Sequence, residues 1–128
     1  MEKEAIVIDT NIFIDYLRNF KPAVDFFESI IKREDIYFSA ITEAELLAGK
    51  ENEDAGKREK LLRLLYSWNK IPVDNPSVIL AGDLSRQYGI AIPDAIIAST
   101  ALTSNAVFIT KNIRHFDSIP KLRIKSPY

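Results

Sequence analysis

The sequence predicts an α/β fold in which a central, mostly parallel sheet lies between two layers of helices. Short apolar runs of strand length alternate with longer segments of helical periodicity, as in parallel sheets with helical crossovers. The segment 94–102 is apolar on nearly every side, apart from Ser99 and Thr100, so we expect it to be a helix at the centre of the domain. The length of 128 residues fits one domain that spans 1–128.

The first half of the chain supplies two strands and three helices. Short runs rich in Ile, Val or Phe are typical of buried strands, and apolar residues three or four apart are typical of helices. Pro22 is favoured as a first helical residue, and Gly49 is favoured just after a helix. The expected elements are a strand at 5–8, helices at 11–18 and 22–33, a strand at 36–39 and a helix at 42–48.

The second half is interpreted in the same way. Leu61, Leu65 and Trp68 mark one face of a first helix, at 57–69. Gly89 ends a second helix, at 76–88. The expected elements are a helix at 57–69, a strand at 71–73, helices at 76–88 and 94–102, and strands at 106–109 and 122–125.

The residue types that are missing narrow the possible chemistry. The chain has no Cys and one His, which excludes a thiol nucleophile and zinc sites built from Cys and His. A Ser-His-Asp triad could use only His115. An enzyme of this composition would therefore work through carboxylates. Clustered carboxylates repel one another unless they are protonated or bridged by a hard cation such as Mg²⁺ or Mn²⁺.

The net charge of −1 is unevenly placed along the chain. Residues 111–128 hold five basic residues and one acid, which gives them +4 and leaves −5 for residues 1–110. Two interpretations stay open: the basic segment is a solvated surface, or it is a phosphate-contacting rim beside an acidic pocket.

The compartment is inferred from what the sequence lacks. There is no run of about 18 apolar residues, so we expect no membrane span. The N-terminus lacks the basic start and apolar stretch of a signal peptide. Cytoplasm is the default expectation, and the absence of cysteine agrees with it weakly.

Three acidic residues stand out, although each has an ordinary structural explanation. Asp9 could cap the helix that follows it. Glu45 completes a capping-box pattern with Thr42. Asp94 follows Pro93 at a helix start, where the helix dipole favours negative charge.

Taken together, the three acids favour a metal site. Asp9 follows the first strand, Glu45 lies one turn into the helix after the second, and Asn112 follows the strand at 106–109. Sites of open parallel sheets form outside the carboxyl ends of the strands, so these groups share an edge. Asp94 opens the most apolar helix, and a shared cation is a natural way to hold several buried carboxylates together.

Other polar residues are weaker candidates. Glu43 points away from Glu45 around the helix and is expected at the surface or behind the site. Asp15 is expected to be solvated, and His115 could contact phosphate, although a lone His is more often structural. Thr10 and Asn11 are ordinary turn and cap residues that could also orient Asp9.

The segments assembled above resemble the PIN-domain nucleases, specifically the VapC-like toxins of bacterial and archaeal toxin–antitoxin pairs. Four pieces in order carry the resemblance, and they span nearly the whole chain. They are residues 8–14 (IDTNIFI), 39–49 (SAITEAELLAG), 93–98 (PDAIIA) and 109–112 (ITKN), with Phe116 four residues further on.

The resemblance implies a PIN-like three-layer α/β/α fold and an endoribonuclease that uses Mg²⁺ or Mn²⁺. Asp9, Glu45 and Asp94 match the main acidic positions of the family. Thr10 matches a hydroxyl that supports the first Asp, and Thr110 matches another polar site residue. The resemblance also implies a homodimer and a small VapB-like antitoxin that wraps the toxin.

One position departs from the fuller family pattern. Many PIN domains carry a fourth acid where this chain has Asn112. An amide brings no negative charge, so a second metal ion would be held less tightly. This favours a reaction that uses one metal ion over one that uses two. Asp117 is the alternative source of that charge, but its spacing fits less well, so we favour Asn112 as the group nearer the metal.

Three hypotheses follow for the function. The leading one is metal-dependent hydrolysis of RNA phosphodiesters, in which water attacks phosphorus in line and Lys111 or Arg114 holds the RNA backbone. The second is a catalytically weak PIN domain that binds RNA or protein, kept open by Asn112. The third is phosphotransfer through an aspartyl intermediate at Asp9, disfavoured because Asn11 stands where the usual signature needs a second acid.

Overall fold

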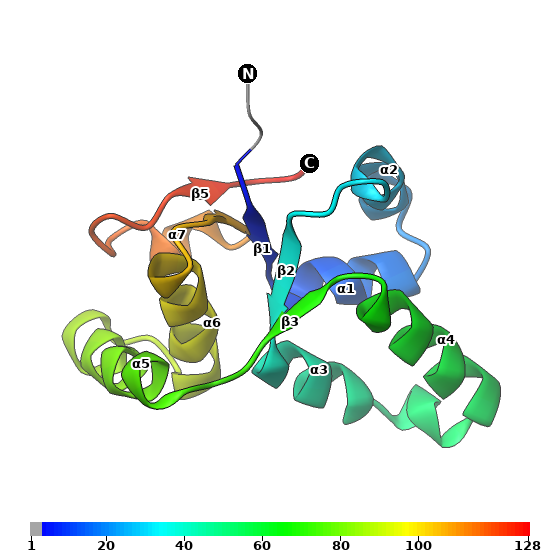
Figure 1. Ribbon diagram of the computed structural model, residues 1–128, viewed down its shortest axis with the longest axis horizontal. Coiled ribbons are helices and arrows are strands. Elements are labelled where there is room, and N and C mark those ends of the chain that lie inside the picture. Colours follow the sequence, from blue (N-terminus) through cyan, green and yellow to red (C-terminus); the bar gives the residue numbers. More distant parts are fainter. Residues whose placement is uncertain (1–3) are drawn as a thin grey trace.

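A five-stranded sheet organises the chain, which a computed structural model describes over residues 4–128 (Figure 1). All five strands are parallel and lie in the order β3-β2-β1-β4-β5. This confirms the predicted parallel α/β sheet, which is fully rather than mostly parallel. The strands are β1 (Ile6–Ile8), β2 (Ile36–Ser39), β3 (Asn69–Ile71), β4 (Val107–Ile109) and β5 (Ile124–Lys125).

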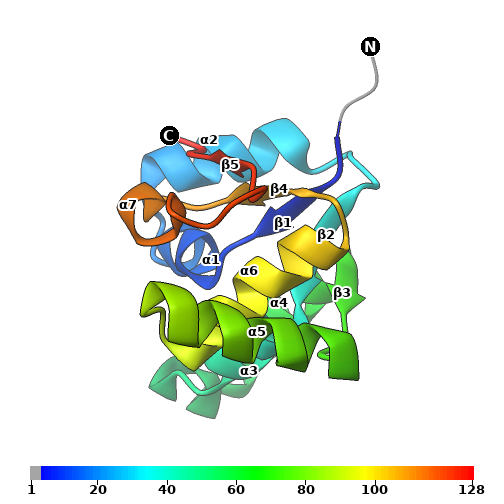
Figure 2. The ribbon, with the colours of Figure 1, turned by 90° about the vertical axis from the view of Figure 1, so that its left-hand side faces the viewer.

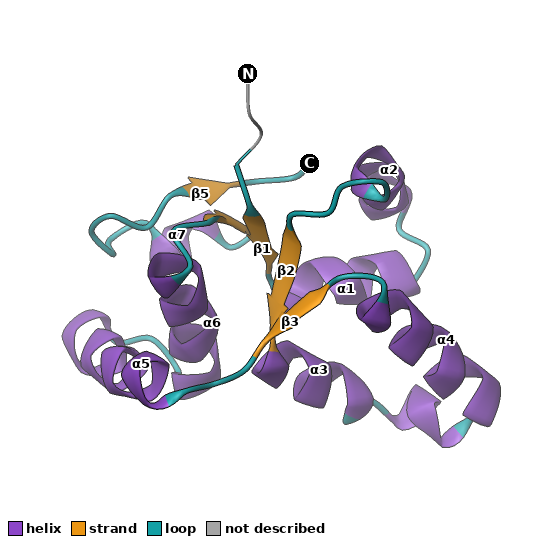
Figure 3. Cartoon of the chain, viewed as in Figure 1, coloured by secondary structure: helices purple, strands orange, loops and turns teal. Residues whose placement is uncertain are grey.

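Helices cover both faces of this sheet. Helices α5 and α6 lie on one side, and α1, α2 and α4 lie on the other, as Figures 1 and 2 show from two directions. The α-helices are α1 (Thr10–Leu17), α2 (Lys21–Ile30), α3 (Ala40–Leu47), α4 (Ala55–Tyr66), α5 (Asn75–Tyr88), α6 (Ile92–Thr103) and α7 (Ile113–Phe116), and a 3₁₀ turn, η1, spans Lys50–Glu53 (Figure 3).

The sheet separates two apolar cores because successive strand residues point to opposite faces. In β1, Ile6 and Ile8 join the core beneath α1, α2 and α4, whereas Val7 joins the core beneath α5 and α6. Helix α6 is buried along most of its length, and Ser99 and Thr100 donate their hydroxyl protons to the carbonyl of Ile96. The predicted central helix at 94–102 is therefore confirmed.

Several predicted boundaries were wrong. The helix predicted at 57–69 ends at Tyr66, and the strand predicted at 71–73 is Asn69–Ile71. The side chain of Asn69 explains the shift, because it donates to the carbonyls of Glu34 and Ile36 and ties this residue to the edge of β2. The helix predicted to reach residue 33 ends at Ile30, and neither α7 nor η1 was predicted.

The strand order creates a switch point beside β1. From β1 the chain adds β2 and β3 on one side, and it then crosses back to place β4 on the other. Ligand sites of open α/β sheets form outside the carboxyl ends of the strands at such a point. The residues that follow β1 and β4 therefore lie where a site is expected. Within residues 4–128, no helix combines the length and apolarity needed to cross a membrane.

An aromatic cluster joins the layer of α1, α2 and α4 to the sheet, and it can be tested by mutation. The ring of Phe13 lies 5.5 Å from that of Phe27 and 6.0 Å from those of Phe38 and Trp68. We expect Phe13→Ala to lower the free energy of unfolding by about 3–5 kcal/mol, measured by urea denaturation, because it leaves a cavity in a close-packed core. The control Phe20→Ala, at a residue 48% exposed, should cost about 1 kcal/mol or less. Equal losses would contradict this view of the core.

Candidate active site

Asp9 is a buried carboxylate at the switch point of the sheet. It directly follows β1, and its backbone N–H donates to the carbonyl of Ile109 at the end of β4 (2.9 Å). The residue is 3% exposed, and the hydroxyl of Thr110 donates to its Oδ2 (2.8 Å). Asp9 occupies the N-cap position of α1, but its side chain makes no capping hydrogen bond. The capping explanation for this acid is therefore wrong.

Glu45 is brought to the same edge by α3. The predicted capping box is wrong, because Ser39 is the N-cap, accepting from the N–H of Ile41, and Thr42 lies inside the helix. The hydroxyl of Thr10 donates to Glu45 Oε1 (2.7 Å) and also lies 2.9 Å from the hydroxyl of Thr42. Thr10 therefore links α1 to α3 and holds the Glu45 carboxylate.

Asp94 enters from the other layer of helices. It lies in the first turn of α6, which begins at Ile92, where the helix dipole stabilises negative charge. Its side chain is 37% exposed, and its Oδ2 lies 3.2 Å from Nε2 of His115. The sequence had favoured a structural role for His115, so this proximity was missed. No sequence pattern indicated this contact, because the short helix α7 that carries His115 was not predicted.

The pKa of Asp9 responds to its burial and to the two other acids. Burial raises the pKa of Asp9 from 3.8 to about 6. The negative charges of Asp94 and Glu45 contribute to this rise, while the Thr110 hydrogen bond opposes it. The charges of Asp94 and Glu45 therefore reach Asp9. That the three acids together form a metal site stays a prediction.

Three further predicted site residues, Asn11, Asn112 and Asp117, are more exposed than Asp9. The N–H of Asn112 donates to the Thr110 hydroxyl (3.0 Å), so Asn112 is joined to Asp9 through Thr110. Its side chain is exposed, as are those of Asn11 and Asp117. Asp117 lies at the far end of α7. Whether Asn112 or Asp117 lies nearer a metal stays a prediction.

The candidate RNA contacts, Lys111 and Arg114, both come from the segment that follows β4. Arg114 is exposed on α7. Lys111 is also exposed, but its ammonium donates to the backbone carbonyl of Tyr128 and lies 5.0 Å from the centre of that ring. The Tyr128 hydroxyl in turn donates to Asp15 (2.6 Å), so Asp15 is hydrogen-bonded rather than simply solvated. Of the two cations, Arg114 is therefore the less engaged.

Glu43 has a structural role at a distance from the acids. Its Oε2 pairs with Lys70 of β3 at 2.9 Å. This contact ties α3 to the edge of the sheet. It agrees with the expectation that Glu43 lies outside the centre of the site.

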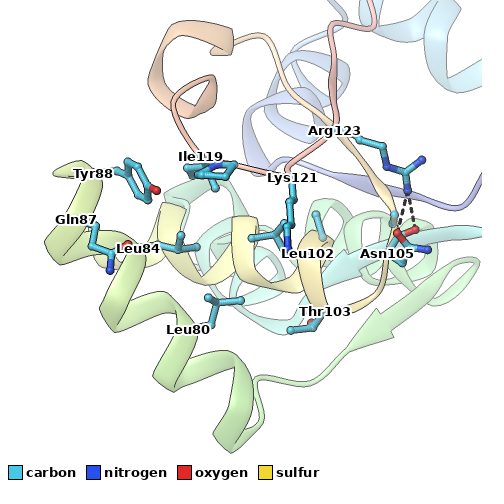
Figure 4. Close-up of a pocket in the computed structure, with 13 residues that line it drawn as sticks. Leu80, Leu84, Gln87, Tyr88, Leu102, Thr103, Asn105, Ile119, Lys121 and Arg123 are labelled. Carbon is cyan, nitrogen blue, oxygen red and sulfur yellow. Dashed lines mark hydrogen bonds between the residues drawn. The ribbon is translucent and has the colours of Figure 1, made fainter.

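A separate cavity of about 470 Å³ lies between α5, the end of α6 and the segment before β5 (Figure 4). Apolar side chains from α5 and α6, among them Leu80, Leu84 and Leu102, face it together with Lys121 and Arg123. None of the three acids lines it.

The residues present fit a divalent cation. The centre offers hard oxygen donors, which Mg²⁺ and Mn²⁺ prefer, and the pKa of Asp9 is raised mainly by burial and also by the charges of Asp94 and Glu45. Among residues 4–128, no group of three Asp, Glu or His side chains is arranged to hold a metal ion by itself, so a cation bound here would need water for the rest of its ligands. This fits Mg²⁺, which typically takes one or two direct carboxylates and keeps several waters.

The raised pKa of Asp9 predicts a stability effect. The folded chain binds more protons than the unfolded chain between pH 3.8 and about 6, so ionisation of Asp9 lowers stability as pH rises through this window. Asp9→Asn avoids that cost. In EDTA it should be more stable than wild type above about pH 6, by up to about 3 kcal/mol, since one pKa unit corresponds to about 1.4 kcal/mol.

Urea denaturation across this pH range measures the difference between the two proteins. The advantage of Asp9→Asn should shrink as pH falls and vanish below about pH 4. A variant that is equally or less stable at every pH would contradict the account of Asp9.

Comparison with known proteins places this geometry in a family. A model of the PIN domain matches residues 6–122. Ribonuclease VapC19 of Mycobacterium tuberculosis is 32% identical over 123 residues, which cover 91% of this chain and 96% of that protein. A toxin–antitoxin complex from Klebsiella pneumoniae contains a chain of TM-score 0.82 and 27% identity, covering 97% of this chain and 98% of that one.

A further solved structure has the same fold. It is VapBC2 from Rickettsia felis bound to a DNA fragment from the promoter, with TM-score 0.80 and 27% identity over 95% of this chain and 98% of that chain. The family match covers most of the sequence and agrees with the parallel sheet flanked by helices. The chain belongs to the PIN-domain family.

Proposed function

We propose that this chain is a metal-dependent endoribonuclease, the toxin of a VapBC-type pair, in which residues 1–128 form one PIN-like domain. The observation that carries the proposal is that Asp9 lies buried at the switch point of a PIN-domain sheet, where the charges of Asp94 and Glu45 reach it. Relatives named as VapC ribonucleases support the reaction. Neighbours solved as toxin–antitoxin complexes support the biological setting.

The proposed cation is Mg²⁺ or Mn²⁺, held directly or through water by Asp9, Glu45 and Asp94. Such a cation stabilises negative charge on a phosphodiester and makes water more acidic. One ion is favoured over two, because Asn112 adds no charge at the position where many relatives have an acid. Asp117 is the alternative fourth group.

The residues of the chain contribute position and charge. Thr110 and Thr10 hold one oxygen each of Asp9 and Glu45, which fixes the acids at the edge of the sheet. In-line attack of water on phosphorus would leave 5′-phosphate and 3′-hydroxyl ends. Arg114 and Lys111 would contact the RNA backbone beside the acidic centre, which fits the +4 charge of residues 111–128.

The proposed partners are a VapB-like antitoxin and a second copy of the chain. Large apolar side chains are exposed on both helical layers. On one side, Val78 and Ile79 of α5 are 51% and 68% exposed, and on the other, Ile31 and Tyr66 are 53% and 70% exposed. These exposed side chains support protein partners on both layers, which would bury them on binding. Cytoplasm is the proposed compartment, where an enzyme that cleaves cellular RNA meets its substrate.

Removal of an acid or of the metal tests the reaction. We expect Asp9→Asn and Asp94→Asn each to slow cleavage of total RNA at least about 100-fold, because several kcal/mol of charge stabilisation at phosphorus is lost. EDTA should abolish cleavage by the wild type, and Mg²⁺ or Mn²⁺ should restore it. Asp83→Asn, on the exposed side of α5, is the matched control and should keep full activity.

The same assay separates the rival hypotheses. Full cleavage in EDTA or by Asp9→Asn would exclude the proposed mechanism. Stable RNA binding without cleavage in either metal would favour a binding module, which Asn112 keeps open.

The basic rim is tested by salt dependence. Arg114→Ala should weaken RNA binding about equally for different RNA sequences, because a phosphate contact carries no sequence information. The slope of log affinity against log salt should fall by about 1, measured by filter binding with the inactive Asp9→Asn chain. Arg63→Ala, on exposed α4, is the control. An unchanged slope for Arg114→Ala would remove Arg114 from the interface.

A further inference from the structure

Each of the three acids faces one polar side chain from another segment. Thr110 donates to Asp9 Oδ2, and Thr10 donates to Glu45 Oε1. These hydroxyls fix one oxygen of each acid. Among residues 4–128, the second oxygen of each of the three carboxylates accepts no side-chain hydrogen bond. In metal sites, groups behind the ligands orient them in this way.

Asp94 has its counterpart in His115. The His115 Nε2 lies 3.2 Å from Asp94 Oδ2. That nitrogen is buried, yet it has no hydrogen-bond partner among the described residues. The carboxylate oxygen is close enough to accept but lies off the direction required for a hydrogen bond. Buried polar groups are nearly always paired, and Asp94 Oδ2 is the acceptor that lies beside this nitrogen.

The imidazole is anchored to the core of the molecule. Its ring stands edge-on to Phe116, with centroids 5.0 Å apart, and Phe116 packs in the same way against Phe108 of β4 (4.9 Å). Both phenylalanines are buried. The position of His115 is therefore tied to β4, the strand that also carries Thr110 to Asp9.

We propose that His115 is the positioning residue of Asp94: its Nε2–H donates to Oδ2 and aims the other oxygen at the cation. This inference rests on the proposed function, since it gives the Asp94 ligand the support that Thr110 and Thr10 give the other two acids. Loss of such a supporting group typically lowers metal affinity about 10–100-fold.

The first experiment measures Mn²⁺ affinity of the full chain without RNA, by electron paramagnetic resonance of free Mn²⁺. His115→Leu removes the donor and should weaken Mn²⁺ binding about 10–100-fold. His115→Gln keeps an N–H donor and should stay within about 5-fold of wild type. Circular dichroism melting of each variant shows that it is folded.

Two results would overturn the proposal. One is wild-type affinity in His115→Leu, which would show that the donor is not needed. The other is equal weakening in the Leu and Gln variants, which would assign the effect to ring packing on Phe116 instead of to the hydrogen bond.

A second measurement does not depend on metal. Because the chain has one His, its ¹⁵N spectrum contains a single imidazole, whose protonated nitrogen can be identified without ambiguity. We expect Nε2 to carry the proton in metal-free wild type, and its resonance to shift in Asp94→Ala. A proton mainly on Nδ1, or a spectrum unchanged in Asp94→Ala, would contradict the proposal. A wild type that binds no Mn²⁺ would instead contradict the proposed function, while this spectrum still tests the contact.

Discussion

Burial of the Asp9 carboxylate at the end of β1 is the constraint on which the site depends. β1 is the middle strand of a fully parallel sheet, so the residue after it emerges between two neighbouring strands with little access to water. Burial and two acidic neighbours raise its pKa to about 6. An ionised group in that place lowers stability until a positive partner arrives. The fold thus holds an acid where ionisation is costly and a cation is favoured.

The surrounding residues make this arrangement specific. Thr110 follows β4 and Thr10 opens α1, so the two hydroxyls that hold Asp9 and Glu45 come from segments adjacent to the sheet. Asp94 comes from the first turn of α6, and the buried residues of this helix pack into the core on the other face of the sheet. The acids therefore sit on rigid elements, while the exposed side chains of Asn112 and Arg114 lie on the turn and short helix beyond β4.

Much of this was predictable from the sequence, and the failures have physical reasons. Parallel topology follows from alternating strand and helix periods, and Asp9 could be placed because it follows an apolar run. The Thr42–Glu45 capping box failed because Ser39, directly after β2, starts the helix earlier and frees Thr42 to meet Thr10. Asn69 joined β3 through tertiary hydrogen bonds that no local pattern encodes. The pairing of His115 with Asp94 depends on α7, which is too short to show a helical period.

The central claim is that Asp9 is a buried acid and that a divalent cation offsets the free-energy cost of ionising it. A ¹³C NMR titration of the Asp9 side-chain carboxyl, with and without saturating Mg²⁺, tests it most directly. We expect the Asp9 titration to have its midpoint near pH 6 without metal. With Mg²⁺ the midpoint should be clearly lower, because the cation stabilises the charged form. A midpoint near the ordinary value of 3.8 without metal, or one that Mg²⁺ does not move, would contradict it.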